Sequence, residues 1–302
     1  MNPDGSVNRY KARLIAKGYS QIEGIDYTDN FSPVANTIMV RLFLGIVVAH
    51  SWPVHQLDIN NAFLYGSLNE KVYMTPPDWY FAPSGQVCKL QRSLYSLKQT
   101  SRQWNLEFTF KVAGFGFKQS AHDHCLFIKS VPQGLEIAPS TEGMSITHHK
   151  YAMDIINDSR MVSATLVSTP LLPGLKLSAT SRTFLKEPHK CWQLIGRLLY
   201  LAFTRPSLSF VVQQLSHFLK HPTDQHWATT LHIVHYLKDA PDTGLFFPAS
   251  NSLHISAYTD ADWGACVNSH RSVTGYCVFL GSSLISWKYK KQNNVSCSSA
   301  EA

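Results

Sequence analysis

The sequence predicts an α+β fold, and the main reason is that the spacing of its apolar residues changes along the chain. Apolar residues recur at helical spacing over 36–49 and 191–238, whereas from 253 onward they alternate with polar residues, as in half-buried strands. A chain of 302 residues with 44% hydrophobic residues can form a substantial core, which argues against disorder throughout. We therefore expect helices and antiparallel strands in separate regions of the chain.

Short elements separated by loops are expected in the N-terminal part. In chain order they are a basic strand over 9–15, a buried helix over 36–49 and a strand over 55–59. The helix should end before Pro53, because a residue that precedes proline disfavours the helical conformation. Prolines at 76, 77 and 83 predict a loop, and order should resume over 87–97.

Three consecutive helices are expected over 191–238. Each has one apolar face, made by Leu194, Leu198 and Leu201, then by Leu208, Val212, Leu215 and Leu219, then by Trp227, Leu231 and Val234. Pro206 suits the first position of the second helix, and the third helix should halt before Pro241.

Three strands are expected near the C-terminus. Polar and apolar residues alternate over 253–259, and two further runs over 274–280 and 284–289 flank a turn at Gly281. A sheet of this kind exposes an apolar face unless another element covers it. We expect this sheet to lack a cover, so that 253–302 exchanges its amide protons quickly or drives self-association, unless the helical region 191–238 packs on the same face.

Charge and cysteine content limit the class of protein. The formal net charge of +7 and the pI near 9.0 favour polyanionic partners. Six cysteines without a C-x-x-C pair suggest free thiols in a reducing compartment. No stretch approaches 18 uninterrupted apolar residues and no leader is recognisable, so we expect no membrane contact and an intracellular location, cytoplasmic or nuclear.

The first candidate for chemistry is Asp58. It ends an apolar-polar alternation and is followed five residues later by Phe63. A nucleotidyl transferase uses such a carboxylate to hold Mg2+ and such an aromatic ring to wall the sugar pocket. Taken alone, however, an Asp at the end of a strand can equally cap the next turn.

The surroundings of Asp58 resemble the reverse transcriptase of Ty1/copia-type retrotransposons. Strings similar to that family occur in the family's order across nearly the whole chain, at 10–21, 24–27, 31–34, 56–66, 72–74, 94–99, 134–138, 167–170, 195–200, 204–206, 258–263, 271–276, 285–288 and 298–301. The resemblance implies an RNA-directed DNA polymerase with RNase H, a requirement for Mg2+ and an RNA or DNA template-primer as partner.

The resemblance also implies an order of domains. A partial right-hand polymerase of fingers and palm would occupy 1–133, a helical connection 134–250, and a truncated RNase H-like domain with an incomplete sheet 251–302. The implied site residues are Asp58 and Asp260 as catalytic metal-binding carboxylates, Phe63 as the gate against a ribose 2′-OH, Arg13 or Lys17 as the cation for the triphosphate, and Lys98 and Gln99 in the segment that covers nucleotide and template. Without the resemblance, Arg13 and Lys17 would suit a solvated edge strand, and Asp260 with Asp262 a turn.

Several parts of the family pattern are missing. The family supplies its other palm carboxylates from a Tyr-x-Asp-Asp hairpin, but this sequence contains no Asp-Asp pair and passes from Lys129 almost directly to Gly134. Ser96 and Ser101 replace a family Gly and Pro, and the second RNase H acid lies beyond the residue that matches Glu301. We therefore expect an internally deleted, truncated remnant without activity. The alternatives are a non-catalytic nucleic-acid-binding module and, less favoured, a polymerase completed by a partner.

Overall fold

The computed structural model describes residues 14–77, 79–81, 83–129, 142–161, 165–172, 174–175, 177–178 and 183–301. The chain divides into two compact units, which we call the N-terminal unit (1–36 and 55–134) and the C-terminal unit (37–54 and 135–302). Helices and small antiparallel sheets occur in both, which confirms the α+β prediction. Within the described residues, every helix is too short or too polar to cross a membrane.

The N-terminal unit has little regular structure and a small core. Its elements are η1 (Gly18–Ser20), η2 (Ala62–Tyr65), α2 (Thr100–Gly114), the pair β1 (Tyr73–Met74) with β2 (Cys88–Lys89), and the pair β3 (Lys118–Gln119) with β4 (Phe127–Ile128). Ala16, Val72 and Leu97 form its buried apolar cluster. This cluster joins the segment before η1 to the segment before α2.

One expected strand of this unit is absent from the structure, and another lies mostly outside the described residues. The strand predicted over 55–59 is wrong, because these residues have no regular conformation and are exposed, Leu57 to 89%. Alternation stabilises a strand only where a partner strand and a covered face exist, and this segment has neither. Of the strand predicted over 9–15, residues 9–13 lie outside the described residues, and Ile15 forms an isolated bridge to Tyr95.

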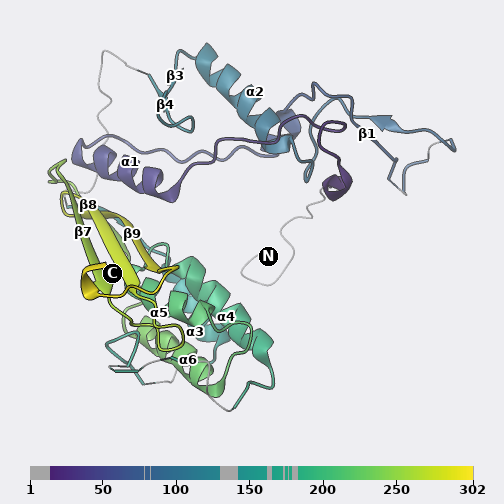
Figure 1. The fold of residues 1–302 in the computed structure, drawn as a ribbon. Coiled ribbons are helices and arrows are strands. Elements are labelled where there is room, and N and C mark those ends of the chain that lie inside the picture. The colour runs from purple at the N-terminus through teal and green to yellow at the C-terminus, as the bar shows by residue number, and fades with distance from the viewer. Residues whose placement is uncertain are drawn as a thin grey trace. The chain divides into compact units, whose positions relative to one another are not determined.

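Four helices form the main core of the C-terminal unit. They are α3 (His149–Asp158), α4 (Pro188–Leu201), α5 (Pro206–Ser216) and α6 (Asp224–Asp239). Figure 1 shows them side by side, and each buries an apolar face in one cluster, with Ile155, Leu198, Leu208 and Ile233 fully buried. The three helices expected over 191–238 are confirmed, although α4 begins earlier and Leu219 lies beyond the end of α5.

The three strands expected near the C-terminus are confirmed as one antiparallel sheet. Its order is β7 (Ile255–Asp262), β8 (Val273–Leu280) and β9 (Ser283–Lys291), with a bulge after Val278. Gly281 adopts a φ of 57° in the turn between β8 and β9, a conformation that glycine takes without strain. A separate pair joins β5 (Gly143–Ile146) to β6 (Leu245–Pro248).

Helices cover the sheet along β9. From α5, Ser209 accepts a hydrogen bond from Trp287 Nε1 at 2.7 Å, and the rings of Phe210 and Tyr289 lie 4.9 Å apart. The helical region therefore covers the sheet at this strand, contrary to the expectation of an uncovered sheet, whereas β7 is mostly exposed.

A second cover comes from α1 (Thr37–Ala49), which matches the helix expected over 36–49 but belongs to the C-terminal unit. Its Arg41 is only 8% exposed and lies 4.0 Å from the centroid of the Trp287 ring. The Arg41 guanidinium donates hydrogen bonds to the carbonyls of Phe203, at 2.6 Å, and Ile285, at 3.4 Å. This arginine therefore ties α1 to both β9 and the end of α4.

The start of α6 depends on a buried histidine. Nδ1 of His226 accepts a hydrogen bond from the backbone N–H of Thr223 at 3.1 Å, the position that Glu or Gln takes in a capping box. The His226 ring stacks on Phe218 with centroids 4.3 Å apart. Burial lowers the pKa of His226 from its usual 6.5, so the fold favours the neutral ring.

We expect the C-terminal unit to lose stability in mild acid through His226. A group with a lowered folded-state pKa stabilises the fold above its unfolded pKa, and this contribution is lost as the pH falls through the folded-state value. The free energy of unfolding in urea should therefore decrease below about pH 6.5. His226→Gln, whose amide oxygen can accept the same N–H, should flatten the decrease. The slope that remains is assigned to His217, whose pKa is also lowered, first by burial and then by Lys291. An unchanged slope in His226→Gln would contradict this assignment.

Candidate functional site

The segment that precedes α2 is held in place by two glutamines. Gln99 is fully buried; its Nε2 donates to the carbonyl of Asp26 at 3.2 Å, and its Oε1 accepts from Gln21 Nε2 at 3.1 Å. Gln21 Oε1 in turn accepts from the backbone N–H of Lys98 at 2.8 Å. The Gln99 amide is thus occupied within the protein, and it positions the exposed Lys98 beside it.

The segment around η1 packs directly on the same turn. The N–H of Ala16 donates to the carbonyl of Tyr95 at 3.0 Å. A Cβ placed on Gly18 would lie 1.8 Å from the carbonyl oxygen of Ser96, so only glycine allows this approach. Lys17, at the start of η1, is thereby held close to the turn.

Ser96 occupies a position where the chain needs a left-handed conformation. Its φ is 72°, and the residue is exposed. Ser96 replaces the glycine that the resemblance leads one to expect, and its positive φ is a conformation that glycine adopts without strain.

Ser96→Gly is expected to stabilise the N-terminal unit by about 1 kcal/mol, since a side chain in this region of backbone space costs roughly that much. Urea unfolding measures the change. Ser96→Ala serves as the matched control, because it removes the exposed hydroxyl and keeps the Cβ. Equal effects of the two substitutions would show that the backbone strain is not the cause.

Lys17 and Lys98, two of the residues singled out from sequence, share one shallow depression. Its volume is about 500 Å3, and its lining is Ile15, Ala16, Lys17, Gly18, Tyr19, Ser96, Leu97 and Lys98. Both lysine side chains are exposed at its edge. Two ammonium groups at the edge of one depression suit a phosphate group. Arg13, the alternative cation, lies outside the described residues.

Phe63 is linked to the same turn through an aromatic contact. It lies in η2, and its ring meets that of Tyr95 edge to face at 5.8 Å. The chain enters η2 through Asn61, which has a φ of 54°, and leaves it at Gly66, where a Cβ would approach Gln103 to 2.9 Å. The turn at Tyr95 therefore connects Phe63 with the strand-like segment of Ile15 and Ala16.

Asp58 does not belong to a cluster of potential metal ligands among the described residues. It is exposed in the irregular segment before η2. Over the described ranges, no three residues among His, Cys, Asp and Glu are grouped so that they could hold a metal ion. Two-metal phosphoryl transfer needs several converging carboxylates, so the donor set around Asp58 does not fit such a centre.

Asp260 has one carboxylate neighbour on its own strand. It lies in β7 with Asp262 two residues on, so the two side chains leave the strand on the same face. Both are exposed, and Asp260 Oδ1 accepts the N–H of Ala261 at 2.9 Å. A pair on one exposed strand likewise falls short of the carboxylates that a two-metal centre requires.

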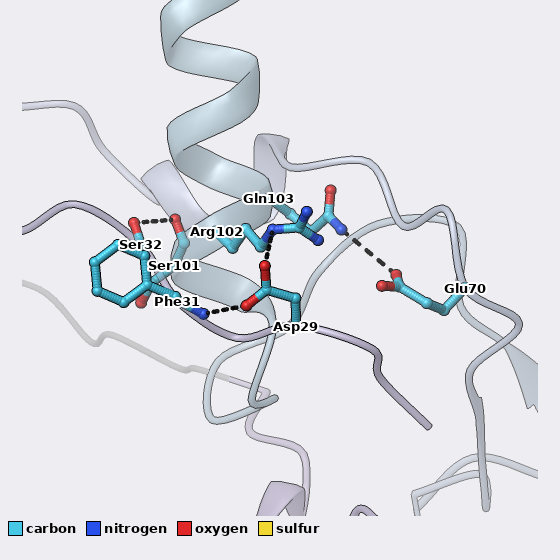
Figure 2. A network of polar contacts seen from close by, with 7 residues as sticks. All are labelled: Asp29, Phe31, Ser32, Glu70, Ser101, Arg102 and Gln103. Carbon is cyan, nitrogen blue, oxygen red and sulfur yellow. Dashed lines mark hydrogen bonds and ion pairs between the residues drawn. The ribbon is translucent and has the colours of Figure 1, made fainter. Parts of the chain in front are cut away.

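A polar network that the sequence analysis missed fastens the N-terminus of α2 (Figure 2). Arg102 Nε lies 3.4 Å from Asp29 Oδ2, whose other oxygen accepts the N–H of Phe31 at 3.0 Å. Ser32 donates to the carbonyl of Ser101 at 3.1 Å, and Gln103 to Glu70 at 3.4 Å. Except for the local bond between Asp29 and Phe31, these pairs join residues far apart in the chain, so no local spacing could have indicated them.

Comparisons with known proteins cover the whole chain. A family model described as reverse transcriptase (RNA-dependent DNA polymerase) matches residues 2–134. The retrovirus-related Pol polyprotein from transposon RE2 of Arabidopsis thaliana is 37% identical over 100% of this chain and 24% of its own length. The corresponding polyprotein from transposon TNT 1-94 of Nicotiana tabacum is 30% identical over 99% of this chain and 27% of its own length. No solved structure matches the chain.

The chain thus spans about a quarter of these polyproteins. A shorter relative, the uncharacterized mitochondrial protein AtMg00810 of Arabidopsis thaliana, is 34% identical over 56% of this chain and 70% of its own length. The alignment with the RE2 polyprotein has 348 positions for 302 residues of this chain, so about 46 positions of that relative have no counterpart here.

Proposed function

Because the chain belongs to the reverse transcriptase family of Ty1/copia-type retrotransposon Pol polyproteins, we propose that it is a polymerase remnant that no longer transfers nucleotides. Reverse transcriptases bind a nucleic-acid template and generally use divalent metal ions. The observation that carries the proposal is the carboxylate set: Asp58 is exposed, and among the described residues no three His, Cys, Asp or Glu side chains are grouped so that they could hold a metal ion. One carboxylate is too few for two-metal phosphoryl transfer.

The positions of the RE2 polyprotein that have no counterpart in this chain support the same proposal. The sequence runs from Lys129 almost directly to Gly134 and has no Asp-Asp pair, and about 46 positions of the RE2 polyprotein have no counterpart. A deletion at this point would remove the hairpin that carries the remaining palm carboxylates. In this proposal residues 1–133 derive from fingers and palm, 134–250 from the connection and 251–302 from an RNase H domain whose first acid is Asp260.

Primer extension tests the loss of catalysis. We expect no template-directed incorporation on a homopolymer RNA template with a DNA primer, in Mg2+ or in Mn2+, because Asp58 lacks the partners that would hold the ions. An active reverse transcriptase in parallel reactions is the positive control. Processive synthesis that disappears in Asp58→Asn would contradict the proposal and would indicate that the carboxylates are supplied from elsewhere, for example by a partner.

The second candidate function is binding of RNA or DNA without catalysis, and the depression lined by Lys17 and Lys98 favours it. The net charge of +7 has the appropriate sign for a polyanion. In this role Lys17 and Lys98 contact phosphates, Gln99 positions Lys98, and Phe63 offers an aromatic face. Arg13 would add a third cation.

Binding to a labelled single strand over a series of salt concentrations tests this function. Lys17→Ala combined with Lys98→Ala should weaken binding and reduce the salt slope by roughly 1.4, since each phosphate contact on a single strand contributes about 0.7. The matched control is Lys111→Ala with Lys118→Ala, which removes the same charge from other exposed positions of the N-terminal unit. If the two double variants lost the same affinity, the loss would come from the lower net charge and not from contacts at the depression, and this proposal would be contradicted.

A further inference from the structure

The C-terminal unit contains a largely apolar pocket that none of the proposed polymerase chemistry uses. Its volume is about 330 Å3, within the range of small-molecule sites. Phe210 and His217 of α5 line one side, Val267 of the β7–β8 connection and Tyr289 of β9 line others, and Leu171 and Leu175 complete it. Burial, and then the charge of Lys291, lower the pKa of His217, so its neutral ring adds to the apolar lining.

A thiol and an ammonium group meet at this pocket. Cys266 and Lys291 both line it, and Lys291 Nζ lies 3.8 Å from Cys266 Sγ. The sulfur is partly buried, and the hydroxyl of Ser269 beside it is buried without a conventional hydrogen-bond partner among the described residues. An ionised sulfur would accept from that hydroxyl and pair with the ammonium group.

The surroundings favour the thiolate. Burial by itself raises the pKa of Cys266, but the hydroxyl of Ser269, the backbone N–H groups of Ser269 and Asn268, and the charge of Lys291 together bring the pKa below its usual 9.0. By contrast, burial raises the pKa of Cys191, and burial followed by Asp123 raises that of Cys125. Since the thiolate is the nucleophilic form of cysteine, these opposite directions favour Cys266 over Cys125 and Cys191 as a nucleophile.

We propose that this pocket is a covalent-modification site, at which Cys266 adds to a small, largely apolar molecule that carries an α,β-unsaturated carbonyl group. The sulfur donates an electron pair to the β-carbon and forms the S–C bond, while the C=C π bond breaks and its electrons move toward the carbonyl oxygen. The α-carbon then takes a proton from water, which replaces the proton that the thiol released. No group leaves and no oxidant is needed. The apolar lining selects the body of the molecule, and Lys291 stabilises the attacking sulfur.

Two probes with the same reactive group test the proposal on the full chain. Acrylamide and N-phenylacrylamide differ in the phenyl ring, and mass spectrometry of tryptic peptides gives the labelling rate of each cysteine. Cys297 is exposed and lies in a different tryptic peptide, so its rate ratio corrects for the intrinsic reactivity of the probes. At Cys266 we expect the ratio of phenyl to plain rates to exceed that at Cys297 by roughly tenfold, because the ring is buried only there. Equal ratios would overturn the proposal.

Three substitutions distinguish the contribution of the apolar pocket from that of the reactivity of the thiol. Lys291→Met should slow both probes at Cys266 several-fold, because Lys291 Nζ lies 3.8 Å from the sulfur. Lys288→Met, a matched loss of charge at an exposed position of the same strand outside the pocket lining, should not slow them. Val267→Trp, at a position that is 44% exposed, should fill the pocket and abolish the preference for the phenyl probe while acrylamide still reacts. A preference that survives Val267→Trp, or equal effects of the two lysine variants, would overturn the assignment. These readouts do not involve nucleic acid, so they are independent of the proposed polymerase ancestry.

Discussion

Trp287→Ala is expected to destabilise the C-terminal unit by about 3 kcal/mol, the lower end of the cost of removing a large core aromatic. The substitution removes the ring that lies 4.0 Å from the Arg41 guanidinium and the N–H that donates to Ser209. Arg41 is nearly buried, so it would lose its stacking partner without gaining water in exchange. Urea unfolding gives the loss of stability, and hydrogen exchange along β9 shows whether α1 and α5 separate from the sheet.

Trp263→Ala is the matched control in the same unit. Trp263 is 55% exposed, and its N–H donates to the carbonyl of Ser296 at 3.0 Å. A single exposed hydrogen bond contributes about 1 kcal/mol or less, so this variant should remain close to the parent protein. If both tryptophan variants lost the same stability, the contacts of Trp287 with α1 and α5 would not be what holds the sheet to the helices.

Gly18→Ala is expected to disrupt the candidate phosphate site, the depression lined by Lys17 and Lys98. The new Cβ would lie 1.8 Å from the Ser96 carbonyl oxygen, and the neighbouring atoms that must yield are backbone. Overpacking of this kind costs about 3 kcal/mol at the upper end of its usual range. The segment with Lys17 would separate from the turn with Lys98, so both the stability of the N-terminal unit and its affinity for a single strand should decrease.

Gly114→Ala provides the control for this substitution. A Cβ at Gly114, the last residue of α2, meets no atom within 4 Å, so alanine should be neutral or slightly stabilising there. Faster hydrogen exchange at Ala16, whose N–H is bonded to Tyr95, would locate the Gly18 effect. Unchanged exchange at Ala16 in Gly18→Ala would contradict the close packing of these two segments.

The site residues show what a family resemblance can predict and what it cannot. The resemblance singled out Lys17 and Lys98, and the structure brings both to one depression. It also singled out Gln99, whose buried amide is bonded to Gln21 and Asp26. A matching string identifies a residue and carries no information about which group its side chain meets. The roles of Asp58, Phe63 and Asp260 remain proposals that the experiments above address.

Local patterns were sufficient for α4, α5, α6 and the strands β7, β8 and β9. Helical and strand periods arise from backbone geometry within a few residues, so the spacing of apolar side chains reports them directly. The segment 55–59 shows the limit of that reasoning, because its alternation has no partner strand to stabilise it.

Tertiary structure alone decided which surfaces meet. Nothing in the apolar face of α1 indicates that it packs with a sheet more than 200 residues later, yet Arg41 bonds to Ile285 across a separation of 244 positions. The same holds for Gln21 and Gln99, which are 78 positions apart. Such contacts depend on shape, on the pairing of buried polar groups and on the exclusion of water, and these properties exist only once the distant segments have come together.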